Sequence, residues 1–209
     1  EAIAATGFTT PMLDLPGLGV ATFRQNRVPV QTPFFESTSS PRVFFAGCAT
    51  QGSSGISKYG HGSASAAVQG FRYNAAVMVR SLAERYFDAK PPAASLDPGA
   101  VVPFLLQETI EGPELWHQQT YLAHAVTFDP DRGIVDDGVV PLAHFVDAPG
   151  PDAVAVTVET DDNGDIHPAL YVRRSGRVED RPLQASILHE FDLAENRAEL
   201  EAAVGPMLR

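Results

Sequence analysis

Apolar residues recur at spacings of three and four through residues 63–87, which is the spacing of one face of an α-helix. The positions on that face are Ala64, Ala67, Val68, Phe71, Ala75, Met78, Leu82 and Tyr86. Ser63 can cap the first turn with its hydroxyl, and Arg80 and Arg85 place positive charge toward the last turns. We therefore predict a helix over residues 63–87 with one apolar face.

Two apolar runs precede this helix. Residues 42–46 are rich in β-forming side chains and lie between Pro41 and Gly47, which predicts a short buried strand. Residues 47–62 then contain five glycines. A shorter run at residues 2–5, stopped by Gly7, predicts another buried strand. Because the chain starts without Met in this apolar run, we expect its first residues to belong to the interior of a larger protein.

The remaining sequence predicts a smaller unit with antiparallel strands. We expect a strand or buried segment at residues 101–106, a helix at 112–125, and strands at 138–146, 153–158 and 169–173. Asn163 and Gly164 form a strong hairpin signal before the last of these strands. Asp192 and Glu195 form a capping box that opens a last helix over 193–204, stopped at Gly205.

A proline-rich stretch divides these two regions. Residues 91–99 are a linker by composition, so we predict an α/β first region at residues 1–90 and an α+β second region at residues 100–209. Residues 1–90 hold eight basic and five acidic residues, a net charge of +3, and residues 91–209 hold seven basic and 21 acidic residues, a net charge of −14. The acidic region is a poor partner for nucleic acid or an anionic membrane.

Composition bears on the cellular location of the protein and on disulfide and zinc chemistry. The 209 residues are 44% apolar and 20% charged, which is typical of a folded chain. Cys48 is the only cysteine, which excludes an internal disulfide and a cysteine-rich zinc site. No apolar run is long enough to span a bilayer and no signal peptide is visible, so we expect a cytoplasmic protein.

The glycine-rich stretch before the helix has two interpretations. Glycines let the backbone approach a ligand, and a helix N-terminus attracts an anionic atom, here near Ser63. Alternatively, the glycines serve only tight turns where the helix packs on a sheet. The stretch does not match the nucleotide P-loop motif, because Ser53 stands directly after Gly52 where that motif has a lysine. It does not match the dinucleotide-binding motif from Gly60 either, because Ser65 replaces the third glycine.

Other candidate groups are weaker. His117 and His124 stand seven apart on the predicted helix, but no third ligand has an obvious spacing, so we predict no metal site. The acidic residues from Asp161 resemble a calcium loop, yet the glutamate that closes such a loop is absent, which favours a hairpin turn. No catalytic residue can be assigned.

Three segments together resemble a known family. They are Ala5-Thr6-Gly7-Phe8, the run from Val43 to Gly52, and Gly70-Phe71-Arg72-Tyr73-Asn74. They are similar to the C-terminal part of FAD-dependent, NAD(P)H-linked oxidoreductases with two dinucleotide domains, namely flavin-containing monooxygenase-like and pyridine nucleotide-disulfide oxidoreductase-like proteins. The resemblance covers about residues 1–87. It implies the C-terminal part of a Rossmann-like FAD-binding domain over residues 1–90.

The resemblance also implies which residues meet the cofactor. Gly47 would permit close approach to the FAD chain, and Cys48 replaces the usual aspartate there. The other implied cofactor-binding residues are Thr50, Gln51 and Gly52 on the ribityl or pyrimidine side, and His61, Gly62 and Ser63 near the flavin ring. A missing hydrogen bond at Cys48 would cost about 1.5 to 3 kcal/mol, or about tenfold to a hundredfold in affinity.

The glycine-rich motifs that bind the FAD pyrophosphate and NAD(P) lie upstream in the family and are absent from this sequence. We therefore expect a partner half that carries them, on another chain or in a segment not included here. The implied reaction passes hydride from NAD(P)H to FAD and on to oxygen or another small-molecule acceptor. The acidic region would serve contact with a partner, the substrate or a second copy. The alternative is a non-catalytic interaction module derived from a flavoprotein, whose acidic region docks a basic protein.

Overall fold

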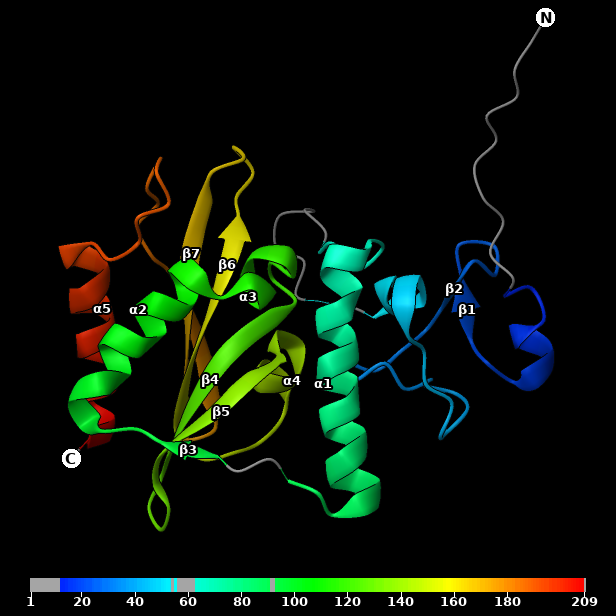
Figure 1. Ribbon diagram of the computed structural model, residues 1–209, viewed down its shortest axis with the longest axis horizontal. Helices are drawn as coiled ribbons and strands as arrows, with labels where there is room; N and C mark the ends of the chain where they lie inside the picture. Colours follow the sequence, from blue (N-terminus) through cyan, green and yellow to red (C-terminus); the bar gives the residue numbers. More distant parts are fainter. Residues whose placement is uncertain (1–11, 54, 56–62, 91–92, 209) are drawn as a thin grey trace, which may run out of the picture.

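The computed structural model describes residues 12–53, 55, 63–90 and 93–208, and its centre is a six-stranded sheet (Figure 1). Every neighbouring pair of strands is antiparallel, in the order β3-β5-β4-β6-β7-β8. The strands are β3 (Ala94–Ser95), β4 (Leu122–Asp129), β5 (Gly133–Pro141), β6 (Ala153–Thr160), β7 (Ile166–Arg174) and β8 (Arg177–Pro182). A separate pair joins β1 (Thr22–Phe23) to β2 (Val28–Pro29).

Five α-helices and four short 3-10 helices surround the sheet in the described part of the chain. The α-helices are α1 (Val68–Phe87), α2 (Val101–Glu111), α3 (Pro113–His117), α4 (Leu142–Asp147) and α5 (Ala194–Val204). The 3-10 helices are η1 (Leu15–Leu18), η2 (Gly47–Gly52), η3 (Pro98–Ala100) and η4 (Gly205–Leu208). None of the described helices is long and apolar enough to cross a membrane.

The sheet has two unlike faces, and β6 shows why. Its sequence alternates alanine or threonine with valine from Ala153 to Val158. Successive side chains of a strand point to opposite faces, so the valines line one face and the smaller residues line the other. On the valine face, Leu105 of α2 and Leu200 of α5 are fully buried in the main core cluster. Figure 1 shows α2 and α5 side by side on that face.

The alanine face accepts α4 closely because its side chains are small. Leu142 and Phe145 of α4 pack with Ala123, Ala125 and Ala155. The longer helix α1 packs near the start of β4. Its Val77 joins a cluster with buried Phe35, Tyr121 and Leu122. Figure 1 shows α1 between the sheet and the segment that holds β1, β2 and η2.

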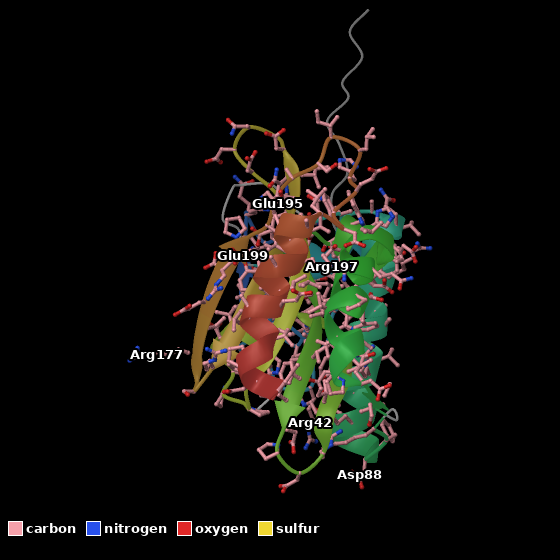
Figure 2. All side chains as sticks on the ribbon, turned by 90° about the vertical axis from the view of Figure 1, so that its left-hand side faces the viewer. Arg42, Asp88, Arg177, Glu195, Arg197 and Glu199 are labelled. Carbon is pink, nitrogen blue, oxygen red and sulfur yellow. The ribbon has the colours of Figure 1, made fainter. Side chains whose placement is uncertain are left out.

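Both edges of the sheet are poor templates for further strands. At one edge, β3 is only two residues long. At the other edge, β8 contains mostly charged residues, of which Arg177, Glu179 and Asp180 are exposed. Figure 2 shows Arg177 standing away from the sheet. Short strands and charged side chains are common protections of sheet edges.

Several sequence predictions are confirmed. The helix predicted over 63–87 is present as α1, although it begins at Val68. The last helix is present as α5, but the predicted capping box of Asp192 and Glu195 is wrong, because the N-cap is Leu193 and no side chain caps it. Strands β6 and β7 pair as predicted, and the turn between them uses Gly164 at a φ of 88°. The antiparallel sheet expected after residue 100 is also present, and β3 adds an edge strand from within the range predicted as the linker.

The predicted Rossmann-like parallel sheet is not seen among the described residues. Residues 42–46 were expected to form a strand, but Phe44 makes only an isolated bridge to Glu36. The one parallel contact there is an isolated bridge between Gln31 and Ser53. Arg42 has a φ of 67°, which breaks an extended run, and Phe45 is buried with Val20 instead of against a neighbouring strand. The run predicted at residues 2–5 lies outside the described residues.

Two predictions in the second region are wrong. The strand expected at 138–146 ends with β5 at Pro141, and the helix α4 begins at Leu142. The helix expected at 112–125 ends with α3 at His117, and β4 begins at Leu122. Thr120 between them has a φ of 60°, which interrupts a right-handed helix, and the following residues are apolar on both faces, as a central strand requires. Of the two alternatives for residues 101–106, a strand or a buried segment, the buried segment is present: this run begins the helix α2, and Val101, Val102, Leu105 and Leu106 are buried.

Candidate functional site

Most of the described residues that were predicted to bind a cofactor lie in η2, beside the segment that leads into α1. Gly47 adopts a φ of 64°, which favours glycine, and a Cβ atom there would meet no atom within 4 Å. Cys48 and Gln51 are exposed. The Cys48 thiol donates to the carbonyl of Ala66 at 3.2 Å. The structure therefore leaves Gly47, Cys48 and Gln51 accessible on the outside of η2.

Thr50 is directed inward and is fully buried. It belongs to four buried polar side chains that we call the Asn74 network, namely Thr50, Ser65, Asn74 and Gln118. The Asn74 amide donates to Thr50 Oγ1 at 3.0 Å and to Ser65 Oγ at 2.9 Å. The Gln118 amide donates to Asn74 Oδ1 at 2.8 Å, and Ser65 Oγ donates to Gln118 Oε1 at 3.1 Å.

The Asn74 network ties three parts of the chain together. Thr50 comes from η2, Asn74 from α1, and Gln118 from the turn before β4. Thr50 Oγ1 also donates to the carbonyl of Gly47 at 2.7 Å. A buried polar group without a partner costs about 1 to 3 kcal/mol, so these mutual bonds favour one arrangement of the three elements. The network holds η2 in place and so fixes the exposed side of η2.

Gly52 is also buried, and its glycine identity has a packing reason. A Cβ atom at Gly52 would lie 2.6 Å from Val28 Cγ1 and would collide with the carbonyl oxygen of Pro29. The space that a cofactor would need at this position is therefore filled by β2. Close approach of backbone to backbone, rather than to a ligand, requires this glycine.

Ser63 is half-buried, and its Oγ lies 2.7 Å from Ser65 Oγ. The prediction that Ser63 caps α1 is wrong, because the N-cap is Ala67 and no side chain caps it. A turn closes from the Ala67 N–H to the Ala64 carbonyl and folds back over Gly70, where a Cβ atom would lie 2.9 Å from Ala64 Cβ. His61 and Gly62 lie outside the described residues.

A second polar site, which the sequence did not predict, is a cleft of about 440 Å³ between α1, β5 and α4. Its charged side chains are Arg80, Glu84, Lys90, Arg132, Asp136 and Asp137. Arg80 crosses from α1 to β5 and donates to the carbonyls of Asp137 at 3.3 Å and Val139 at 3.1 Å. These carbonyls are available because the register of β4 and β5 shifts at Gly138, which has a φ of 71°.

His124 stands beside this cleft, because its hydrogen-bond partner Asp136 lines it. Its Nε2 lies 2.7 Å from Asp136 Oδ1 and its Nδ1 lies 2.9 Å from Glu108 Oε2. Burial disfavours the charged ring, but the hydrogen bonds and charges of Asp136 and Glu108 outweigh burial and raise its pKa to about 9. The ring of Phe104 meets it edge-on at 5.0 Å. The imidazolium is therefore charged at neutral pH.

This ion triad joins α2 to β4 and β5, and both of its carboxylates are partly exposed. For Asp136, the hydrogen bond and charge of His124 outweigh burial and hold the carboxyl pKa below its ordinary value. In the sequence, His124 was only one of two histidines on a predicted helix. His117 instead stacks on Tyr73 at 5.9 Å, and the described residues include no group of three metal-binding side chains.

Comparisons of this chain with models of protein families, with curated proteins and with solved structures found no match. The function must therefore be argued from the residues and the geometry described above.

Proposed function

We propose that this chain is part of a flavoprotein oxidoreductase that passes hydride from NAD(P)H to FAD and on to oxygen or another small-molecule acceptor. The observation that carries the proposal is the order of three segments: Ala5-Thr6-Gly7, Ala46-Gly47-Cys48, and a glycine-rich stretch that leads into a long helix. The chain works with a partner half that carries the glycine-rich dinucleotide motifs, and it acts in the cytoplasm.

The described residues fit a limited role toward FAD. Gly47, Cys48 and Gln51 offer an accessible surface, and the left-handed Gly47 leaves open space for a ligand above its Cα. Thr50 and Gly52 act from beneath, because both are buried against the chain itself. When bound, FAD supplies the hydride acceptor. This chain supplies one wall of its site and excludes water from that side.

Cys48 limits how tightly this wall holds the cofactor. A thiol is a weak acceptor, and its hydrogen is already donated to Ala66. The aspartate that the family places there would accept a charge-assisted bond worth about 1.5 to 3 kcal/mol. Most of the affinity must therefore come from the partner half. The acidic residues after position 100 supply contacts to that partner, to the substrate or to a second copy.

The proposal is tested on the full assembly, purified from the cell in which the chain occurs and supplemented with FAD. We expect a flavin absorption band in the visible range that persists through gel filtration, and oxidation of NADH or NADPH. An assembly that shows neither a bound flavin nor nicotinamide oxidation would refute the proposal.

A second candidate is a non-catalytic interaction module derived from a flavoprotein. The observation in its favour is the burial of Thr50 and Gly52, two of the residues expected to line the cofactor. The acidic part of the chain, residues 91–209 with a net charge of −14 from seven basic and 21 acidic residues, would dock a basic protein. A colourless preparation that takes up no FAD, and binds a basic protein with strong dependence on salt, would favour this candidate.

A further inference from the structure

The hairpin of β7 and β8 brings three arginines together on one face of the sheet. Arg174 and Arg177 stand directly opposite each other across the two strands. Side chains of directly opposite residues point to the same face, and so do residues two apart on one strand. Arg181, further along β8, therefore shares this face. It is the face covered by α5, because Val172 of β7 belongs to the main core cluster.

The three arginines line one pocket of about 220 Å³ beside the end of α5, which we call the arginine pocket. Among the described residues that line it, Glu179 is the one carboxylate, and Val172 and Ala203 are apolar. Pockets for drug-sized ligands hold about 300 to 1,000 Å³. The arginine pocket is therefore the size of a small ligand or of one chemical group.

The sign of the charge in this pocket is unusual for its part of the chain. Residues 91–209 hold seven basic residues against 21 acidic ones, and three of the seven line the arginine pocket. Like charges directly opposite each other on a sheet are destabilising. Charged residues protect the edge of a sheet, but a carboxylate at position 177 would protect it equally and would also pair with Arg174. The fold alone therefore does not require this cluster of arginines.

Arg181 is partly neutralised, but only loosely. Its guanidinium lies 3.8 Å from a carboxylate oxygen of Glu179 and 3.6 Å from one of Glu199. Both distances exceed the about 2.7 to 2.9 Å of a charge-assisted hydrogen bond, and exposed ion pairs contribute little stability. A ligand that makes closer contacts can therefore compete with both carboxylates for Arg181.

Arg174 and Arg177 carry charges that the described carboxylates do not neutralise. Neither arginine forms an ion pair with a carboxylate in the described part of the chain. Arg174 donates to the carbonyl of Ala203 at 3.3 Å, near the end of α5. Arg177 is exposed and extends into solvent (Figure 2), so its flexible side chain can turn toward a ligand in the pocket.

We propose that the arginine pocket binds a small phosphate dianion, either free phosphate or the phosphate group of a small ester. Guanidinium groups bind phosphate through two parallel N–H donors. A phosphate ester carries about 1.5 to 2 negative charges at pH 7, which matches the charges of Arg174 and Arg177, whereas one carboxylate would match only one of them. The net charge of −14 over residues 91–209 repels a polyanion such as nucleic acid, so the ligand is small.

The arginine pocket is independent of the proposed function. Figure 1 shows α5 at one end of the molecule, well apart from α1. Phosphate binding can therefore be measured on this chain without FAD or a partner half, and its failure would leave the flavoprotein proposal untouched.

The test follows the arginine side-chain NMR resonances of the full chain during titration with inorganic phosphate and, separately, with glycerol phosphate. We expect saturable shifts at Arg174, Arg177 and Arg181, and none at Arg132, an exposed arginine in the turn between β4 and β5. The tighter of the two probes shows whether the pocket takes the free ion or an ester. Shifts that do not saturate, that also appear at Arg132, or that sodium chloride alone reproduces would overturn the proposal.

Matched variants separate binding from a structural role. Arg177→Glu removes a donor and places a carboxylate opposite Arg174, so phosphate affinity should fall at least about tenfold, while the thermal unfolding midpoint without ligand should not fall. Arg132→Glu makes the same charge change outside the pocket and should leave the affinity unchanged. Glu199→Gln removes a competitor for Arg181 and should raise the affinity. Unchanged affinity in Arg177→Glu, an equal fall in Arg132→Glu, or a fall in Glu199→Gln would contradict the proposal.

Discussion

The ion triad of Glu108, His124 and Asp136 makes the stability of the folded chain depend on pH. The pKa of His124 is about 9 in the folded chain and about 6.5 for an unperturbed histidine. Because folding raises this pKa, the stabilisation is complete below about pH 6.5 and is lost as the pH rises through about 9. At about 1.4 kcal/mol for each pKa unit, the contribution is about 3 kcal/mol.

The perturbation is His124→Gln, which keeps a hydrogen-bonding side chain but cannot become charged. The assay is urea unfolding, followed by circular dichroism, at several values between about pH 6 and pH 9. The wild-type chain should lose about 3 kcal/mol more than the variant over this interval. His189→Gln, which removes an exposed histidine, serves as the control and should follow the wild type.

A direct measurement of the ring strengthens the test. The NMR resonance of the His124 ring should titrate near pH 9 and should move to lower pH in Asp136→Asn. A difference in stability between wild type and His124→Gln that stays constant with pH would refute the reasoning, as would a titration near the ordinary value. At acidic pH the opposite sign holds for Asp136, whose lowered pKa contributes stability that is lost as the pH falls.

Three further predictions concern the η2 region. Asn74→Ala removes the centre of the Asn74 network and should lower the free energy of unfolding in urea by about 3 kcal/mol, because buried partners are left unpaired; a loss below about 1 kcal/mol would contradict this. Gly52→Ala should cost about 2 kcal/mol through overpacking against β2, whereas Gly99→Ala, where a Cβ meets no atom within 4 Å, should change stability by less than about 0.5 kcal/mol. Cys48→Asp should raise the FAD affinity of the full assembly about tenfold or more, with Cys48→Ser as the uncharged control, and unchanged affinity would remove Cys48 from the cofactor site.

The sequence could predict elements whose side chains interact locally. The hairpin of β6 and β7 is local, because its two apolar runs are joined by the short turn at Asn163 and Gly164. It can therefore be predicted without knowledge of contacts between distant residues. The long helix α1 can be predicted for the same reason. Its first residue is harder to predict, because a turn closed by Ala64 and Ala67 precedes the helix and no side chain caps it.

Elements that depend on distant contacts were predicted wrongly. Residues 42–46 have the composition of a strand, but their pairing within the described chain stops at one isolated bridge from Phe44 to Glu36, and Phe45 packs in a small cluster with Val20. The range expected as a helix, 112–125, includes the first apolar residues of β4. These residues form a strand because they pair with β5 and β6. Periodicity alone cannot distinguish a buried strand from a buried helix over such a short run.

The candidate site shows the same limit. The sequence placed Gly47, Cys48 and Thr50 in one segment, and the structure keeps them together in η2. It could not show that Thr50 turns inward, because its partner Asn74 lies 24 residues further along the chain, and Gln118, the partner of Asn74, lies another 44 residues on. The pairing of His124 with Glu108 and Asp136 likewise joins a helix and two strands, and no spacing in the sequence marks it.

The closed edges of the sheet restrict how this protein can assemble. A partner that added a strand would have to pair with the two residues of β3 or run beside the exposed charges of Arg177, Glu179 and Asp180 on β8. Both routes are unfavourable, and the same features discourage growth of the sheet into fibres. Association is therefore directed away from pairing of backbones and toward packing of side chains.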